Sequence, residues 1–73
     1  MMKMEIKVGG TYRHYKGNLY KVLYLATHTE TEEKLVVYQD LKDESKVWAR
    51  PVSMWNETVK TENGEVLRFE SLS

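Results

Sequence analysis

The chain has 73 residues and no cysteine, and its 11 lysines and arginines balance its 11 aspartates and glutamates. This length supports one hydrophobic core, and without cysteine there is neither a disulfide nor a thiolate metal site. Electroneutrality argues against non-specific binding of nucleic acid through many phosphate contacts, but it is compatible with a local basic patch. No apolar run reaches the roughly 18 residues of a membrane span. The N-terminus lacks the apolar segment of a signal peptide, so we expect a cytoplasmic protein.

The first half of the chain predicts two strands joined by a tight turn. Residues 11–15 (TYRHY) are rich in β-formers, and KGN at 16–18 has the residues of a hairpin turn. Residues 19–28 (LYKVLYLATH) form the longest stretch with strand character. Both alternating faces of this stretch are largely apolar, so either both are covered or a bulge exchanges them. A helix is the competing interpretation.

The second half predicts shorter strands at residues 34–41, 46–50, 57–60 and 65–69. An acidic loop at 29–33 precedes the first of these strands, and a charged turn at 42–45 separates it from the second. Asn63–Gly64, before the last strand, is a strong hairpin signal. Pro51 should end a strand, because it cannot donate a backbone hydrogen bond. Residues 52–56 predict a single helical or 3-10 turn, with Met54 and Trp55 packing inward.

Short strands and tight turns predict an all-β (mainly β) domain, a small and strongly bent barrel. An SH3-like barrel is the leading topology, and an OB-like barrel or an open meander is the alternative. We expect residues 1–9 to form a leader or edge strand, residues 10–70 the single domain, and residues 71–73 a tail.

A register argument divides the predicted sheet into two faces. It pairs His28 with Lys34 and Tyr24 with Tyr38. If the turn at 42–44 sets Leu41 opposite Ser45, it also pairs Tyr38 with Trp48, whereas a four-residue turn at 42–45 would move Trp48 and Arg50 to the leucine face. One face then gathers aromatic, imidazole and guanidinium groups: Tyr24, His28, Val36, Tyr38, Trp48 and Arg50. The other face is the expected apolar core: Leu23, Leu25, Leu35, Val37, Leu41, Val47 and Ala49. A slip of one residue in either hairpin would exchange these faces.

Several motifs resemble a bacterial family of small proteins known as domain of unknown function 1653. They are YRHYKG at 12–17, HTE at 28–30, LVVY at 35–38, WARP at 48–51, Met54 with an aromatic residue at 55, and RF at 68–69. The resemblance covers residues 10 to about 69 and implies a compact, mainly β module without an established activity. It also implies a set of polar positions that belong to the family pattern: Arg13, His14, His28, Glu30, Arg50 and Arg68.

The candidate ligand-binding residues are Arg13, His14, Tyr24, His28, Glu30, Tyr38, Trp48 and Arg50. Each has a structural alternative. The histidines could hydrogen-bond turns, the arginines could pair with the acidic loop, and the aromatic residues could be core. No catalytic order of nucleophile, base and acid is visible, and two histidines without cysteine make a weak metal set.

These residues favour a non-enzymatic binding or adaptor module that recognises an anionic or flat partner. A peptide segment, a nucleotide-like molecule or a structured RNA would fit, and electroneutrality makes RNA the least favoured. One alternative is a small enzyme or enzyme accessory using His14 or His28 with Glu30. Another is a structural homodimer without a ligand. We expect no cofactor, no metal and no membrane partner.

Overall fold

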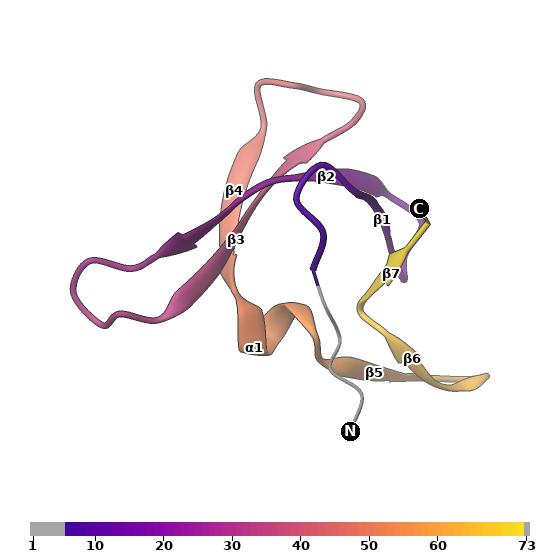
Figure 1. Ribbon diagram of the computed structural model, residues 1–73. Coiled ribbons are helices and arrows are strands. Elements are labelled where there is room, and N and C mark those ends of the chain that lie inside the picture. The colour runs from indigo at the N-terminus through magenta and orange to yellow at the C-terminus, as the bar shows by residue number, and fades with distance from the viewer. Residues whose placement is uncertain (1–5, 73) are drawn as a thin grey trace.

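The computed structural model describes residues 6–72. Figure 1 shows a mainly β domain with one short helix, as the sequence predicts. The elements are β1 (Thr11–His14), β2 (Leu19–Thr27), β3 (Lys34–Asp40), β4 (Val47–Pro51), α1 (Val52–Trp55), β5 (Thr58–Thr61), β6 (Gly64–Leu67) and β7 (Phe69–Ser71). The expected edge strand lies largely in residues 1–5, outside the described part. Residues 6–10 contain no strand, although the N–H of Gly9 donates to the carbonyl of Val22.

Five strands form one antiparallel sheet in the order β4-β3-β2-β1-β7, and β5 and β6 form a separate hairpin. The single last strand expected at 65–69 is divided at Arg68. The part before Arg68 pairs with β5, and the part after it pairs with β1, placing His14 opposite Phe69. The sheet bends around its interior (Figure 1). No strand ladder joins its edges β4 and β7 within residues 6–72, so the bent sheet is not a closed barrel.

The register confirms one predicted hairpin and corrects the other. Between β3 and β4, Tyr38 pairs with Trp48 and Val36 with Arg50, as expected. Between β2 and β3, the expected pairs of Tyr24 with Tyr38 and His28 with Lys34 are wrong. Tyr24 pairs with Val37, and Thr27 pairs with Lys34.

A β-bulge at Leu23 causes part of this difference. Val22 pairs with Tyr38 and Tyr24 with Val37, so Leu23 is the extra residue on β2. One inserted residue moves every later side chain of the strand to the opposite face. Tyr24 therefore lies on the face of Val37, away from Tyr38, and Leu25 lies opposite Val36.

The core lies on the aromatic face of the sheet, and the predicted leucine core is wrong. The buried residues are Tyr12, Val22, Val36, Tyr38, Trp55 and Phe69, with Ile6, Tyr20 and Val52 packed against them. On the opposite side, Leu41 and Val47 are 42% and 49% exposed. The helix and β7 contribute Trp55 and Phe69 to the aromatic face. Covering the flat rings there removes more apolar surface from water than covering the leucines would.

Trp55 connects the helix to the rest of the core. Its ring stacks on Phe69 with centroids 3.7 Å apart and an interplanar angle of 1°. It also contacts Tyr12 and Tyr38 edge-on, at 5.3 and 5.0 Å. The inward packing predicted for Trp55 is confirmed, whereas Met54 is 42% exposed. A helix of one turn can direct only part of its surface inward, and Trp55 occupies that part.

We predict that Trp55→Ala destabilises the fold by about 3–5 kcal/mol, the cost of removing a buried aromatic ring. This is a large part of the stability of a small domain. Met54→Ala, one residue earlier on the same helix, should change stability by less than about 0.5 kcal/mol. Urea unfolding of both variants measures the difference. Equal losses would show that α1 does not anchor the core through Trp55.

The β5–β6 hairpin depends on a glycine with positive φ. Thr61 pairs with Gly64 across the turn, and Gly64 has φ +104°. The hydroxyl of Thr61 accepts the N–H of Asn63 and donates to the carbonyl of Gly64. The hairpin signal is therefore confirmed, and Gly64 occupies the left-handed position that follows the turn.

We expect Gly64→Ala to destabilise the protein by about 1–2 kcal/mol, because a Cβ is strained at positive φ. Apart from Gly64 and its two chain neighbours, no residue has an atom within 4 Å of the added Cβ, so any loss must come from the local backbone. Glu62→Ala in the same turn is the control, because Glu62 is exposed and its φ is not positive. Thermal unfolding compares the two, and equal midpoints would rule out strain at Gly64.

Candidate functional site

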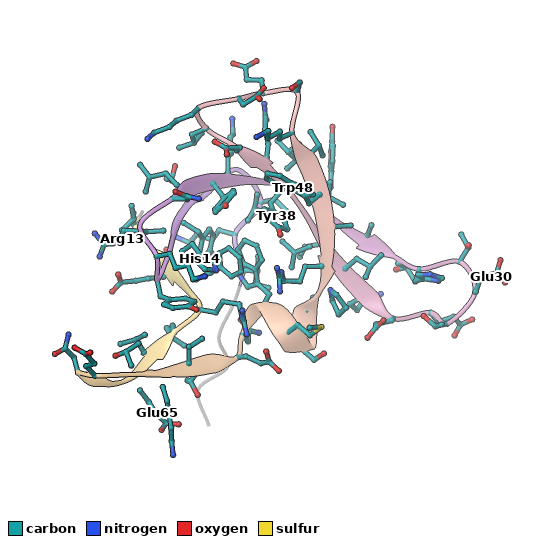
Figure 2. All side chains as sticks on the ribbon, turned by 180° about the vertical axis from the view of Figure 1, so that it is seen from behind. Arg13, His14, Glu30, Tyr38, Trp48 and Glu65 are labelled. Atoms are coloured by element: carbon teal, nitrogen blue, oxygen red, sulfur yellow. The ribbon has the colours of Figure 1, made fainter. Side chains whose placement is uncertain are left out.

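The inner face of the sheet brings together four of the predicted site residues. His14, Tyr38 and Trp48 lie inside the curve of the sheet in Figure 2. Arg50 joins them, because its Nε donates a long hydrogen bond of 3.4 Å to the hydroxyl of Tyr38. Three further residues complete the group. We call the whole set the aromatic–arginine face: His14, Tyr20, Tyr38, Trp48, Arg50, Arg68 and Phe69.

Four rings form the floor and wall of this face. Tyr38 and Phe69 are buried, with centroids 5.7 Å apart. Tyr20 contacts both rings edge-on, at 5.4 and 5.9 Å. Trp48 lies 5.7 Å from Tyr38 and 5.9 Å from Tyr20, and it is 40% exposed. A buried aromatic floor with an accessible indole beside it can hold a flat or apolar group.

Arg50 supplies a positive charge that no carboxylate neutralises within residues 6–72. The ion pairs recorded there are Arg13–Glu70 and Arg68–Glu57, and neither includes Arg50. Its guanidinium carbon lies 5.7 Å from the centroid of the Phe69 ring, which is a cation–π distance. The aromatic floor positions the guanidinium, and its remaining N–H groups can bind an anion.

Arg68 adds a second guanidinium whose hydrogen bonding is incomplete. Its Nη2 lies 3.2 Å from Oε1 of Glu57, but its Nε is buried without a hydrogen-bond partner in the described structure. A buried donor without a partner is costly. A ligand or water oxygen that reached this atom would remove the cost.

His14 is close to the aromatic floor and near enough to both arginines to feel their charges. Its ring is 5.0 Å from Phe69 and 6.4 Å from Tyr20, both edge-on. Burial lowers the pKa of His14 below its ordinary value, and the charges of Arg68, Arg50 and Lys16 lower it further. Its Nδ1 accepts the backbone N–H of Lys16 at 3.2 Å, which leaves Nε2 as the donor in the neutral ring.

The remaining predicted site residues lie elsewhere. Tyr24 is 68% exposed on the opposite face of the sheet, because of the bulge. Glu30 is at the outer end of the β2–β3 hairpin, far from His14 in Figure 2. Nδ1 of His28 accepts the N–H groups of Glu30 and Thr31 at 3.1 and 3.3 Å, which stabilises that hairpin turn. The structure therefore does not bring His14, His28 and Glu30 together.

Arg13 is on an exposed surface and pairs with Glu70 at 2.7 Å, not with the acidic loop. A shallow hollow of about 550 Å³ lies beside this pair, between Tyr15, Lys16 and the β6 residues Val66 and Leu67. The arginine of this hollow already has a carboxylate partner. The aromatic–arginine face is therefore the better candidate for an anionic ligand.

Tyr20, Arg68 and Phe69 were missed as site residues. Arg68 and Phe69 form the RF motif of the family pattern, which was the available signal for them. The sequence did not show that Phe69 lies opposite His14, because this depends on the pairing of β1 with β7. Tyr20 precedes the bulge and so remains on the face of Tyr38, to which its ring is adjacent. Within the described residues, no group of three or more histidine or carboxylate side chains could hold a metal ion. No helix there is long and apolar enough to cross a membrane.

Comparison with known proteins places the chain in a family. No curated protein matches it. A crystal structure of a DUF1653 protein from Bordetella bronchiseptica is similar, with a TM-score of 0.77 and 44% sequence identity. The match covers 85% of this chain and 82% of that one. The family described as "Protein of unknown function (DUF1653)" matches residues 10–71, nearly the whole sequence. The chain therefore belongs to the DUF1653 family.

Proposed function

We propose that this protein is a binding module whose aromatic–arginine face recognises a partner with an anionic group next to a flat or apolar group. The observation that carries the proposal is the unneutralised guanidinium of Arg50 above the Phe69 ring, beside the exposed indole of Trp48. A charged group held at low exposure without a counter-ion is costly. An anionic ligand would supply that counter-ion.

The surrounding groups support the same ligand chemistry. Arg68 offers a buried donor without a partner, and the neutral His14 ring can donate from Nε2. Arginine presents its donors as a planar fork, which matches the oxygens of a carboxylate, phosphate or sulfonate. The aromatic rings contribute contact area that does not depend on charge. The face is thus suited to binding and carries no nucleophile–base pair that would point to catalysis.

We predict that Arg50→Gln weakens the binding of benzenesulfonate, a small flat anion, by about tenfold or more, because a charge-assisted hydrogen bond is lost. Arg13→Gln is the matched control, since Arg13 is already paired with Glu70 outside the face. NMR titration of nitrogen-labelled protein measures both affinities. Equal losses, or shift changes that avoid the Trp48 indole, would contradict the proposed face.

We predict that benzenesulfonate binding strengthens as the pH falls below about 6.5, the ordinary pKa of histidine. The positive charges of Arg68, Arg50 and Lys16 help to lower the pKa of His14. A bound anion offsets those charges and so raises the pKa of His14. By reciprocity, protonation of His14 then tightens anion binding. The charge of benzenesulfonate is constant over this range, so the probe itself contributes no pH dependence.

The control for this pH dependence is His14→Asn, whose side-chain oxygen can still accept the N–H of Lys16. Affinity should then vary less with pH, and titration of the His14 ring by NMR reports its pKa directly. A ligand that leaves the pKa of His14 unchanged would contradict its position next to the anion. Separately, the free protein should lose stability as the pH falls through this range, because the unfolded chain binds the His14 proton more tightly than the folded chain.

A further inference from the structure

Strand β4 is an open edge of the sheet, and its outward backbone groups can be identified. Among the strands of residues 6–72, it pairs only with β3. The N–H of Asp40 donates to the carbonyl of Lys46 at 3.1 Å, which makes this a hydrogen-bonded pair. In an antiparallel ladder such pairs alternate with pairs that are not hydrogen-bonded to each other. The pairs of Trp48 and Arg50 with β3 are therefore hydrogen-bonded.

It follows that the N–H and C=O groups of Val47 and Ala49 point away from β3. None of the backbone hydrogen bonds recorded for residues 6–72 outside the ladders reaches them. Pro51 occupies the next outward position, where its missing N–H leaves no donor unsatisfied. No bulge interrupts the β3–β4 ladder. The edge of β4 is thus regular and ready to accept another strand.

The open edge borders the aromatic–arginine face. Trp48 and Arg50 of β4 belong to that face, two residues apart, and side chains two apart on a strand point to the same side. With respect to an added strand, both occupy non-hydrogen-bonded positions, where side chains of neighbouring strands approach most closely. The residues added beside them would contact the indole and the guanidinium directly.

Charge decides between the possible occupants of this edge. Arg50 has no carboxylate partner within the described residues, and Lys46 immediately precedes β4. A second copy of the protein paired through β4 would bring another Arg50 and another Lys46 to this positive edge. An acidic extended peptide would instead bring the missing counter-charge.

We infer that the partner is an acidic peptide segment that adds to β4 as an antiparallel strand. An aspartate or glutamate lies beside Arg50, and an aromatic or large apolar residue lies beside Trp48. Because the added strand runs opposite to β4, the acidic residue precedes the apolar one by two positions. This inference rests on the proposed function and adds the class of ligand, its backbone pairing and its sequence pattern.

The test uses a capped probe peptide, acetyl-Thr-Glu-Thr-Phe-Thr-amide, and the same residues reordered as acetyl-Thr-Glu-Phe-Thr-Thr-amide. The first peptide directs Glu and Phe to one side of the added strand, and the second directs them to opposite sides. We expect the reordered peptide to bind about tenfold more weakly, measured by NMR titration. In the complex with the first peptide, the amide hydrogens of Val47 and Ala49 should become protected from exchange.

Backbone methylation tests the strand pairing itself. The N–H of the central Thr points toward Ala49, and the N–H of the Phe points away from β4. N-methylation of the central Thr should therefore weaken binding about tenfold, whereas N-methylation of the Phe should have little effect. Equal affinity of the two peptide sequences, or equal effects of the two methyl groups, would overturn the inference.

Two further outcomes separate this inference from the proposed function. If benzenesulfonate binds through Arg50 but neither peptide binds, the strand addition is wrong and the anion-binding face still holds. If the Val47 and Ala49 amides become protected with rising protein concentration in the absence of peptide, the edge belongs to a second copy and the inference is wrong. If neither benzenesulfonate nor the peptides bind, both proposals fail.

Discussion

The stacked pair of Trp55 and Phe69 is the contact on which the rest of the structure depends. The rings lie 3.7 Å apart and are parallel to within 1°. Trp55 comes from the only helix of the described residues, and Phe69 begins β7. Their contact joins the helix to β7, the edge strand of the sheet. Because β7 pairs with β1, this contact also fixes the position of His14 opposite Phe69.

The same pair explains why the candidate site is on the inner face of the sheet. Trp55 stacks on the Phe69 ring. Arg50 and His14 lie 5.7 and 5.0 Å from the centroid of the same ring. The residues that hold the fold together therefore also position the charged groups. A domain this small has little interior relative to its surface, so its core and its binding surface share residues. Tyr38 shows this directly, since it is buried and its hydroxyl accepts a hydrogen bond from Arg50.

The electrostatics of the site follow from this sharing. Arg50 lies over the Phe69 ring, and His14 contacts the same ring edge-on. Burial and positive charge lower the pKa of His14 together, because both disfavour a further charge. Glu57 neutralises only Arg68. The remaining positive charge of Arg50 is the feature that a ligand would complement, and its position on an edge strand places that ligand next to free backbone groups.

The amino-acid sequence by itself determined the order and kind of the elements up to the last strand, whose division at Arg68 it did not predict. Strong local signals were sufficient for the turn at Gly17, the hairpin at Gly64 and the helical turn after Pro51. The family motifs were also visible in the sequence. The sequence offered two registers for β3 and β4, and the structure has the one that sets Tyr38 opposite Trp48 and Val36 opposite Arg50. His14, Tyr38, Trp48 and Arg50 were accordingly predicted as site residues, and the structure brings them together.

Only the tertiary structure decided which face of the sheet is the core. The bulge at Leu23 has no local sequence signal strong enough to locate it, since both alternating sets of residues in β2 are apolar. It removed Tyr24 from the site and left Tyr20 in it. The pairing of β7 with β1 joins residues far apart in the chain, so alternation within either strand could not reveal it. That pairing places Phe69 opposite His14 in the site.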